Sequence, residues 1–221
     1  MVDPQTAVAT LVLDHSECAP VFTRHRIDYC CKGQMPLVEA CRDRGLDVDS
    51  IVSELETAIA RRQPGAAADP RTLSTRDVII KLIAPHHQYL HRTMPFLQGL
   101  AKKVARVHGD RQPSLVHVAT LVDTFVAMMD MHMAEEEGEL FPALISDATT
   151  SAAVMLADMR REHEEVGEML VLLRRAAQDY VAPEWACTSY RTLMKELENM
   201  EADTLAHVHL ENHVLMPRYV S

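Results

Sequence analysis

The sequence of 221 residues is poor in glycine, in tryptophan and in positive charge, and each shortage narrows the fold or the function. Seven glycines and one tryptophan accompany an apolar fraction of 48%, a balance that disfavours a turn-rich β-sandwich and fits long helices. Lys and Arg number 22 against 32 Asp and Glu, a formal charge of −10. Sequence-independent nucleic-acid binding needs a basic surface, so we expect no nucleic-acid partner.

Long apolar runs and an export signal are also missing. No run approaches the about 20 apolar residues that span a bilayer, so we expect no membrane segment. The first residues, MVDPQTAVATLVLDHSEC, have no basic region before their short apolar stretch, which argues against a signal peptide. Five cysteines, an odd number, fit a reducing cytoplasm better than a disulfide framework. We therefore expect a cytoplasmic protein.

The chain divides at a stretch rich in proline, glycine and alanine, RRQPGAAADPRT at 61–72, which is typical of a linker. Before it, residues 1–60 contain short helical pieces, with Gly45 and Asp49 as stop and start signals between two of them. About 60 residues make a marginal core, so this small helical domain is expected to pack on a partner or to dimerise.

After the linker, residues 73–221 show four long stretches with apolar residues every three or four positions, at about 75–107, 113–141, 151–178 and 184–216. This spacing predicts four amphipathic helices, and short connections predict an up-and-down four-helix bundle in an all-α protein. Pro85 and Pro95 lie inside the first stretch and should kink it or shift its start, because each lacks a backbone donor.

The positions of the 12 histidines on these helices indicate which of them could bind a metal. All four apolar stripes include a histidine, and two also include a glutamate: His87, His132 with Glu136, His163, and His207 with Glu211. A buried unpaired carboxylate costs several kcal/mol or becomes protonated, and a shared cation removes that cost. Residues four apart also lie one above the other on a helix, as two ligands of one metal would.

Two of these pairs belong to an internal near-repeat. Histidine, glutamate, leucine and proline recur at offsets 0, +4, +8 and +10, as His132, Glu136, Leu140 and Pro142, and as His207, Glu211, Leu215 and Pro217. The repeat predicts a pseudo-two-fold site with two metals, bridging carboxylates and open positions for a small ligand. Imidazole with carboxylate suits iron, manganese or zinc, and neither Glu-x-x-His nor His-Glu-x-x-His is present.

Other polar residues near the stripes leave alternatives open. His86 and His91 compete with His87, which periodicity favours only weakly. His209 and His213 lie off the apolar stripe, so we interpret them as solvated. The acidic residues beside the candidate ligands are interpreted as solvated or as polar neighbours, Glu162 beside His163 in particular: Glu135, Glu137, Glu139 and Glu162.

Adjacent cysteines in Asp28-Tyr-Cys-Cys-Lys-Gly33 form a second candidate site. Cys30 and Cys31 would bond each other poorly, since the peptide between them must distort, and Lys32 would lower a thiolate pKa. Redox exchange, an intersubunit disulfide, transient iron or cluster binding, and a pair of merely packed thiols all remain open.

These residues together resemble the RIC (repair of iron centres) family, diiron iron–sulfur cluster repair proteins with a hemerythrin-like domain. IDYCCKGQMPLVEACRDRGLDVDSIVSEL resembles the family's N-terminal cysteine-pair domain, and the bundle has HHQYLHRTMPFL, HMAEEEGELFP, REHEEVGEML and HVHLENHVLMPR in family order. The departures are Lys32, where the family usually has glycine, and Met216, where phenylalanine is common.

The resemblance implies a site and a function. It makes His87, His132, His163 and His207 the histidine ligands, and Glu136 and Glu211 the bridging carboxylates, of two non-haem iron ions that are oxo-bridged when oxidised. It also implies repair of clusters damaged by nitric oxide or oxidative stress, with iron donation or binding of nitric oxide or dioxygen, a redox or target-recognition role for Cys30 and Cys31, and a homodimer. A hemerythrin-like oxygen or nitric oxide carrier or sensor without repair activity is the alternative, and nitric oxide reductase turnover is left open.

Overall fold

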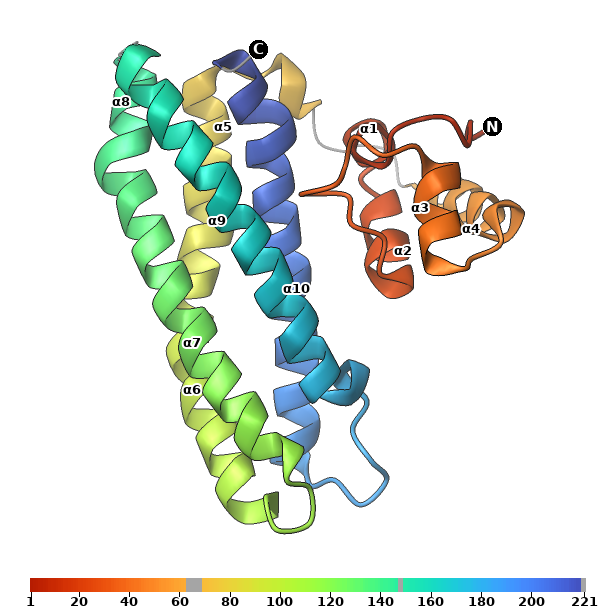
Figure 1. Ribbon diagram of the computed structural model, residues 1–221, viewed down its shortest axis with the longest axis vertical. Coiled ribbons are helices and arrows are strands. Elements are labelled where there is room, and N and C mark those ends of the chain that lie inside the picture. Colours follow the sequence, from red (N-terminus) through yellow and green to blue (C-terminus); the bar gives the residue numbers. More distant parts are fainter. Residues whose placement is uncertain (63–68, 147–148, 220–221) are drawn as a thin grey trace. The chain divides into compact units, whose positions relative to one another are not determined.

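The computed structural model describes residues 1–62, 69–146 and 149–219, and the side chains of all these residues except 149–153. Helices form almost all of the regular structure in these ranges, and the only β pairing there is an isolated bridge between Ala7 and Pro36. The expected all-α fold is therefore confirmed (Figure 1).

Two compact units make up the fold. Residues 1–78 and 205–221 form one unit, and residues 79–204 form the other. Both boundaries lie within helices, α5 (Thr75–Leu82) and α10 (Thr188–Leu210). The division of the chain into 1–60, 61–72 and 73–221 stays a prediction, and the centre of the expected linker, 63–68, lies outside the described residues.

The unit of residues 79–204 is the predicted bundle. Its long helices are α6 (Gln88–His108), α7 (Ser114–Glu135), α9 (Thr149–Ala176) and α10 as far as Thr204, with the short α8 (Phe141–Ile145) between α7 and α9. Helix α7 packs against α6 and α9 (Figure 1). The apolar stripes face inward, as Phe125, Leu173 and Leu197 illustrate by being fully buried. Each such side chain contributes about 1.5–3 kcal/mol by leaving water.

In the described part of the chain, three π-helical turns interrupt the long helices, and the sequence did not predict them. They are η2 (Ile83–His87), η3 (Glu136–Leu140) and η5 (Glu211–Leu215). Each is closed by a backbone N–H that donates to the carbonyl five residues earlier, as Phe141 donates to Glu136 and Met216 to Glu211. Proline follows η3 and η5 at the second position, and its missing N–H and ring favour such a local change of register.

The two prolines of the first helical stretch behave differently. Pro85 lies inside η2, the π-helical turn that separates α5 from α6, so the regular helix is interrupted there as expected. Helix α6 runs through Pro95 without ending, so this proline does not set a helix boundary.

In the other unit, four short helices surround a small apolar core: α1 (Val8–Asp14), α2 (Cys18–His25), α3 (Leu37–Arg44) and α4 (Val48–Ala60). Phe22, Leu37 and Leu55 are fully buried in this core, and Leu205 packs against it from the final part of the chain. Gly45 ends α3 in the left-handed region at φ 65°, as predicted. The next helix is capped by Asp47, which accepts from the Ser50 N–H, rather than by Asp49.

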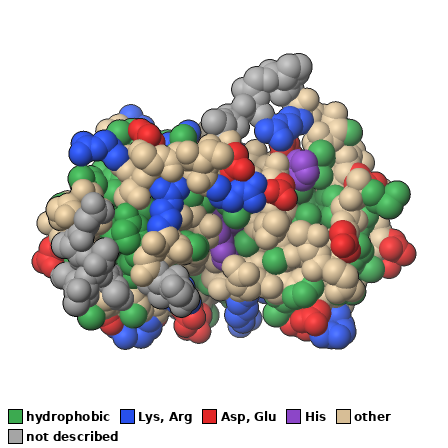
Figure 2. All heavy atoms as spheres, turned by 90° about the horizontal axis from the view of Figure 1, so that it is seen from above, with side chains coloured by type: hydrophobic (Ala, Val, Ile, Leu, Met, Phe, Trp, Pro, Cys, Tyr) green, Lys and Arg blue, Asp and Glu red, His purple; other side chains and the backbone are tan. Residues whose placement is uncertain are grey.

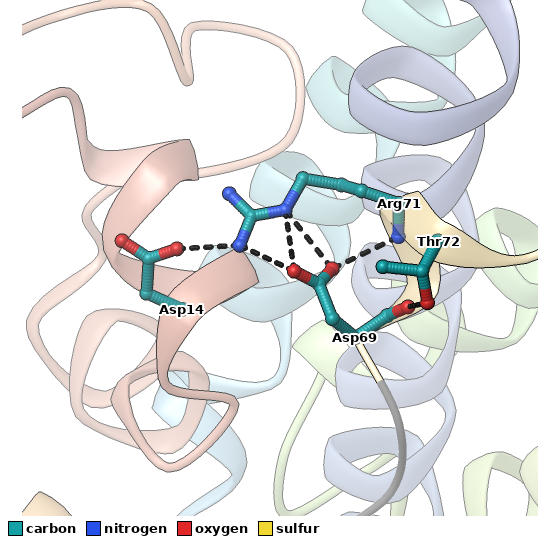
Figure 3. Close-up of polar contacts among 4 residues, drawn as sticks. All are labelled: Asp14, Asp69, Arg71 and Thr72. Carbon is teal, nitrogen blue, oxygen red and sulfur yellow. Dashed lines mark hydrogen bonds and ion pairs between the residues drawn. The ribbon is translucent and has the colours of Figure 1, made fainter.

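An ion pair joins α1 to the short 3₁₀ turn η1 (Pro70–Thr72) in the same unit (Figure 3). Arg71 Nη2 lies 2.7 Å from Asp14 Oδ1 and 2.7 Å from Asp69 Oδ2. Asp69 also accepts from the Arg71 backbone N–H, and the Thr72 hydroxyl donates to the Asp69 carbonyl. The three charged side chains are each about two-fifths exposed, so the contact fixes position more than it stabilises the fold.

The surface mixes charges of both signs. On the face shown in Figure 2, Lys and Arg side chains lie among Asp and Glu side chains, with hydrophobic residues between them. One described segment, Ser114–Ile145, is long and apolar enough to cross a bilayer by length and composition alone. Its apolar stripe is the buried face of α7, and core helices of soluble proteins pass the same test.

Candidate metal centre

The first copy of the repeat places a glutamate between two histidines within the bundle unit. His132 lies in the last turn of α7, and Glu136 is the first residue of η3. His132 Nε2 lies 3.3 Å from Glu136 Oε1, and His87 Nε2 lies 3.3 Å from Glu136 Oε2. Glu136 and His87 have no exposed surface, and His132 is 4% exposed. Each carboxylate oxygen therefore faces its own histidine.

The second copy has the same internal geometry. His207 lies in the last turn of α10, four residues before Glu211, which is again the first residue of a π-helical turn. His207 Nε2 lies 3.1 Å from Glu211 Oε1, and both side chains are fully buried. The fourth histidine of the stripes, His163 on α9, is also fully buried, with its ring 5.1 Å from that of His132.

Six residues from the four stripes form two overlapping groups. Within each group, one ligand atom per residue lies within 4.8 Å of all the others. One group is His87, Glu136, His207 and Glu211, and the other is His132, Glu136, His163 and Glu211. Every member is buried, and both glutamates belong to both groups. All six are residues that the sequence predicted as metal ligands.

The donor spacing fits metal binding. Two neighbouring ligands at right angles around an ion, with bonds of about 2.1 Å, would lie roughly 3 Å apart. The three buried His–Glu pairs have N···O distances of 3.1 to 3.3 Å. Small inward shifts of the side chains would therefore suffice to hold an ion. A set of four imidazoles and two carboxylates suits iron, manganese or zinc and does not suit calcium or magnesium.

Two further carboxylates orient the histidine rings. His87 Nδ1 lies 2.7 Å from Glu137 Oε1, and His132 Nδ1 lies 3.0 Å from Glu162 Oε2. Because an ionised carboxylate only accepts, each Nδ1 carries the proton and each Nε2 is left as the metal-binding atom. The hydrogen bond from His132 lowers the pKa of Glu162. Glu162 was expected beside His163, and the structure pairs it with His132 instead.

The structure separates His87 from its neighbours. His86 Nδ1 lies 2.9 Å from Asp203 Oδ1, and the side chain of His91 is half exposed, 3.9 Å from Glu137. Neither belongs to the two ligand groups of the described residues. His87 is therefore the residue of the three that faces Glu136.

The interpretation of His209 as solvated is wrong. It is 4% exposed, and its Nδ1 donates to the Tyr29 carbonyl at 3.0 Å. Burial lowers the pKa of His209 to about 4. His213, which is partly buried, donates through Nε2 to the Cys30 carbonyl at 2.7 Å, and Asn212 donates to the same carbonyl at 3.1 Å. The apolar stripe could not indicate this second, polar face.

None of the five cysteines forms a disulfide. Cys30 is 2% exposed, and its Sγ lies 3.6 Å from Cys31 Sγ and 3.3 Å from Asp28 Oδ1. The expectation that Lys32 lowers the thiol pKa is wrong for Cys30. The hydrogen bond with Cys31, burial and the charge of Asp28 all raise the pKa of Cys30 well above its usual range.

The charge of a third buried glutamate, which the sequence did not indicate as functional, is compensated in a different way. Glu201 on α10 is 6% exposed, and both its oxygens accept from Arg174 Nε, at 2.9 and 3.1 Å. The Tyr180 hydroxyl also donates to it. Here an arginine balances the carboxylate, whereas Glu136 and Glu211 face histidines.

Comparison with known proteins agrees with this geometry. A family model described as the hemerythrin HHE cation binding domain matches residues 78–219, which include all six buried candidate ligands. The chain belongs to the hemerythrin HHE cation-binding family. A second model, ScdA_N, a domain of unknown function (DUF542), matches residues 4–59, which include the cysteine pair.

Relatives of nearly the same length carry one description. "Iron-sulfur cluster repair protein ScdA" of Staphylococcus epidermidis is 30% identical over 223 residues, which is 99% of each chain. "Iron-sulfur cluster repair protein YtfE" of Yersinia pseudotuberculosis is 28% identical over 212 residues, 96% of this chain and 95% of the relative. The resemblance to cluster repair proteins is thereby confirmed, and membership of the hemerythrin family implies that this chain binds iron.

Proposed function

We propose that this protein repairs iron–sulfur clusters damaged by nitric oxide or oxidative stress, in the cytoplasm, by means of a non-haem diiron centre. The relatives named as repair proteins match nearly the whole chain, and this supports repair rather than a carrier or sensor role. The substrates would be damaged iron–sulfur proteins.

One observation supports the diiron centre most strongly: two groups of four buried ligands overlap in Glu136 and Glu211. Two glutamates common to two groups are what two ions bridged by carboxylates require. His87 and His207 would complete the shell of one ion, and His132 and His163 that of the other. Bound iron would supply redox chemistry and open positions for nitric oxide or dioxygen.

The protein's own residues would prepare this centre. Glu137 and Glu162 hold the protons of His87 and His132 on Nδ1, so the Nε2 atoms stay aimed at the glutamates. The apolar core around the ligands excludes water and keeps their geometry fixed. Phe141, whose ring stacks on His87 at 5.8 Å, restricts the rotation of that imidazole.

The test combines metal analysis with a repair assay on anaerobically purified protein. We expect about two iron ions per chain and reactivation of an iron–sulfur dehydratase whose cluster nitric oxide has damaged. His132→Ala and Glu211→Ala should lose iron and repair, whereas His117→Ala, an exposed histidine on α7, should keep both. A folded protein without iron would overturn the centre. An iron-loaded protein that restores no activity would overturn the repair function.

Two further proposals concern the domain organisation and the oligomeric state of the protein. We propose that residues 1–60 act as a separate domain that mediates homodimerisation, since so small a core gains most from a partner. A monomer by light scattering at micromolar concentration would contradict this.

A further inference from the structure

The cysteine loop contains a third group of candidate metal ligands, which shares no residue with the two groups of histidines and glutamates. Asp28, Cys30 and Cys31 each offer a ligand atom within 4.8 Å of the other two. The loop is short, and all three residues belong to the unit of residues 1–78 and 205–221. The group combines two sulfurs and a carboxylate, a donor set that suits thiophilic divalent ions.

The distances match a tetrahedral ion. With metal–sulfur bonds of about 2.3 Å and metal–oxygen bonds of about 2.0 Å, tetrahedral geometry separates two sulfurs by roughly 3.8 Å and sulfur from oxygen by roughly 3.5 Å. Here the two sulfurs lie 3.6 Å apart, and Cys30 Sγ lies 3.3 Å from Asp28 Oδ1. A disulfide would instead have to bring the sulfurs to about 2.05 Å across a distorted peptide.

We propose that Asp28, Cys30 and Cys31 bind a single thiophilic divalent cation, and that in the proposed repair function this cation is Fe²⁺ in transit. On binding, each thiol loses its proton to solvent and each sulfur donates an electron pair to the ion, with no change in oxidation state. Three protein ligands leave a fourth position for water or for a ligand of an acceptor protein. The identification of the cation as Fe²⁺ rests on the proposed function, whereas the site itself does not.

The loop is organised before any ion arrives. Asp28 Oδ1 accepts from the backbone N–H groups of Cys30 and Cys31, at 3.1 and 2.8 Å, which holds the carboxylate beside the sulfurs. Asn212 and His213 both donate to the Cys30 carbonyl and so fix the backbone of the loop. Ligands held in this way lose little conformational entropy when they bind an ion.

Burial and exposure favour exchange over permanent binding. Cys30 is buried, whereas Cys31 and Asp28 are partly exposed, so the site is open on one side. Closed zinc sites surround the ion with four protein ligands, and sites that exchange ligands keep a position open.

Cobalt(II) added anaerobically to the reduced full-length protein provides the test, because only a cysteine sulfur gives sulfur-to-cobalt charge-transfer absorption. We expect a near-ultraviolet band whose final intensity corresponds to one sulfur-bound cobalt ion per chain. It should be absent from the Cys30→Ser/Cys31→Ser variant and unchanged in Cys187→Ser, the exposed cysteine of the bundle unit. No band in the wild type, or a band that survives the double substitution, would overturn the site.

The Asp28→Asn variant distinguishes the loss of a metal ligand from the loss of the folded loop. The asparagine oxygen can still accept from the two backbone N–H groups, so the loop should persist while the affinity for cobalt falls at least ten-fold. Unchanged affinity would remove Asp28 from the site.

Excess Fe²⁺ should displace the cobalt band and Mg²⁺ should not. Failure of Fe²⁺ to compete would overturn the assignment of the cation. The two histidine–glutamate groups contain no sulfur, so cobalt bound there gives no sulfur-to-cobalt band, and failure of the diiron centre would be recognised separately by metal analysis.

Discussion

The two copies of the His–Glu–Pro repeat are alike on their inner faces and different on their outer faces. In both copies the histidine lies in the last turn of a helix, the glutamate four residues later begins a π-helical turn, and both side chains are buried. The N···O distances within the pairs are also close, 3.3 Å for His132–Glu136 and 3.1 Å for His207–Glu211.

The outer faces of the two turns carry different residues and make different contacts. Directly after the glutamate, the first copy has Glu137 and Gly138, and the second has Asn212 and His213. Glu137 accepts from His87, so the first copy supports its own centre. Asn212 and His213 donate to Cys30, so the second copy holds the cysteine loop. The two copies therefore share the ligand face and differ in what the other face contacts: a histidine of the metal centre in the first copy and the cysteine loop in the second.

The largest effect is expected from removing either glutamate. Because Glu136 and Glu211 each belong to both ligand groups, Glu136→Ala and Glu211→Ala should each disturb both ions. Iron should fall from about two per chain to below one, by elemental analysis of anaerobically purified protein. Glu139→Ala, an exposed residue of the same π-helical turn, should retain full iron. If one substitution removed a single ion and the other removed none, the inner faces would not be equivalent.

Substituting the carboxylates that accept hydrogen bonds from the histidines should lower iron binding less than removing a ligand does. Glu137→Gln and Glu162→Gln remove the charged acceptors of His87 and His132, and loss of such partners costs about 10–100-fold in metal affinity. Competition with a chelator would measure this change against Glu135→Gln, which lies on the exposed face of α7. Equal affinity in all three variants would mean that the outer face of the first copy does not support its centre.

A substitution at Gly33 tests how tightly His213, from the second copy, packs against the cysteine loop. A Cβ at Gly33 would lie 2.5 Å from His213 Nε2, 2.5 Å from the Tyr29 carbonyl and 2.6 Å from Ala9 Cβ. Gly33→Ala should therefore destabilise the fold by about 1–3 kcal/mol, as overpacking does. Gly99→Ala, where a Cβ would meet nothing within 4 Å, should stabilise helix α6 by about 0.5–1 kcal/mol. Thermal unfolding compares the two, and equal behaviour would contradict tight packing at Gly33.

The smallest effect concerns access to Cys30. His213→Ala removes one of the two donors to the Cys30 carbonyl, and a hydrogen bond worth about 1 kcal/mol corresponds to roughly five-fold more frequent opening. Alkylation of Cys30, followed by mass spectrometry, should accelerate by that factor while iron content stays constant.

Cys18 provides the internal control for this measurement. Burial and neighbouring acids raise its pKa to about 12, so at pH 8 it should react slowly in both proteins, and its rate should rise with pH as the thiolate forms. An unchanged rate at Cys30 would show that Asn212 and the packing of Gly33 suffice to hold the loop.

Much of the candidate centre could be predicted from the sequence because a helix converts spacing directly into direction. His132 with Glu136 and His207 with Glu211 stand on apolar stripes, and the structure brings all four into the two groups. The bundle followed from the same period. The π-helical turns could not be predicted, since Pro142 and Pro217 indicate only that a donor is missing.

Helical periodicity could not predict contacts between residues that are distant in the chain. His209 binds the Tyr29 carbonyl across 180 positions, and no local pattern indicates such a partner. Glu201 similarly depends on Arg174 from another helix. Polar faces that bind one backbone carbonyl look like solvated faces in a sequence, and this explains the wrong interpretation of His209.

The central claim is that the two copies together hold a pair of iron ions. X-ray absorption spectroscopy of the iron-loaded protein tests it most directly, because it detects both imidazole ligands and a neighbouring metal. We expect imidazole scattering together with an iron–iron distance of about 3.5 Å, in the range of two-metal sites, and loss of that distance in Glu136→Ala and Glu211→Ala. Fully loaded wild-type protein with imidazole ligands and no iron–iron scattering would contradict the claim.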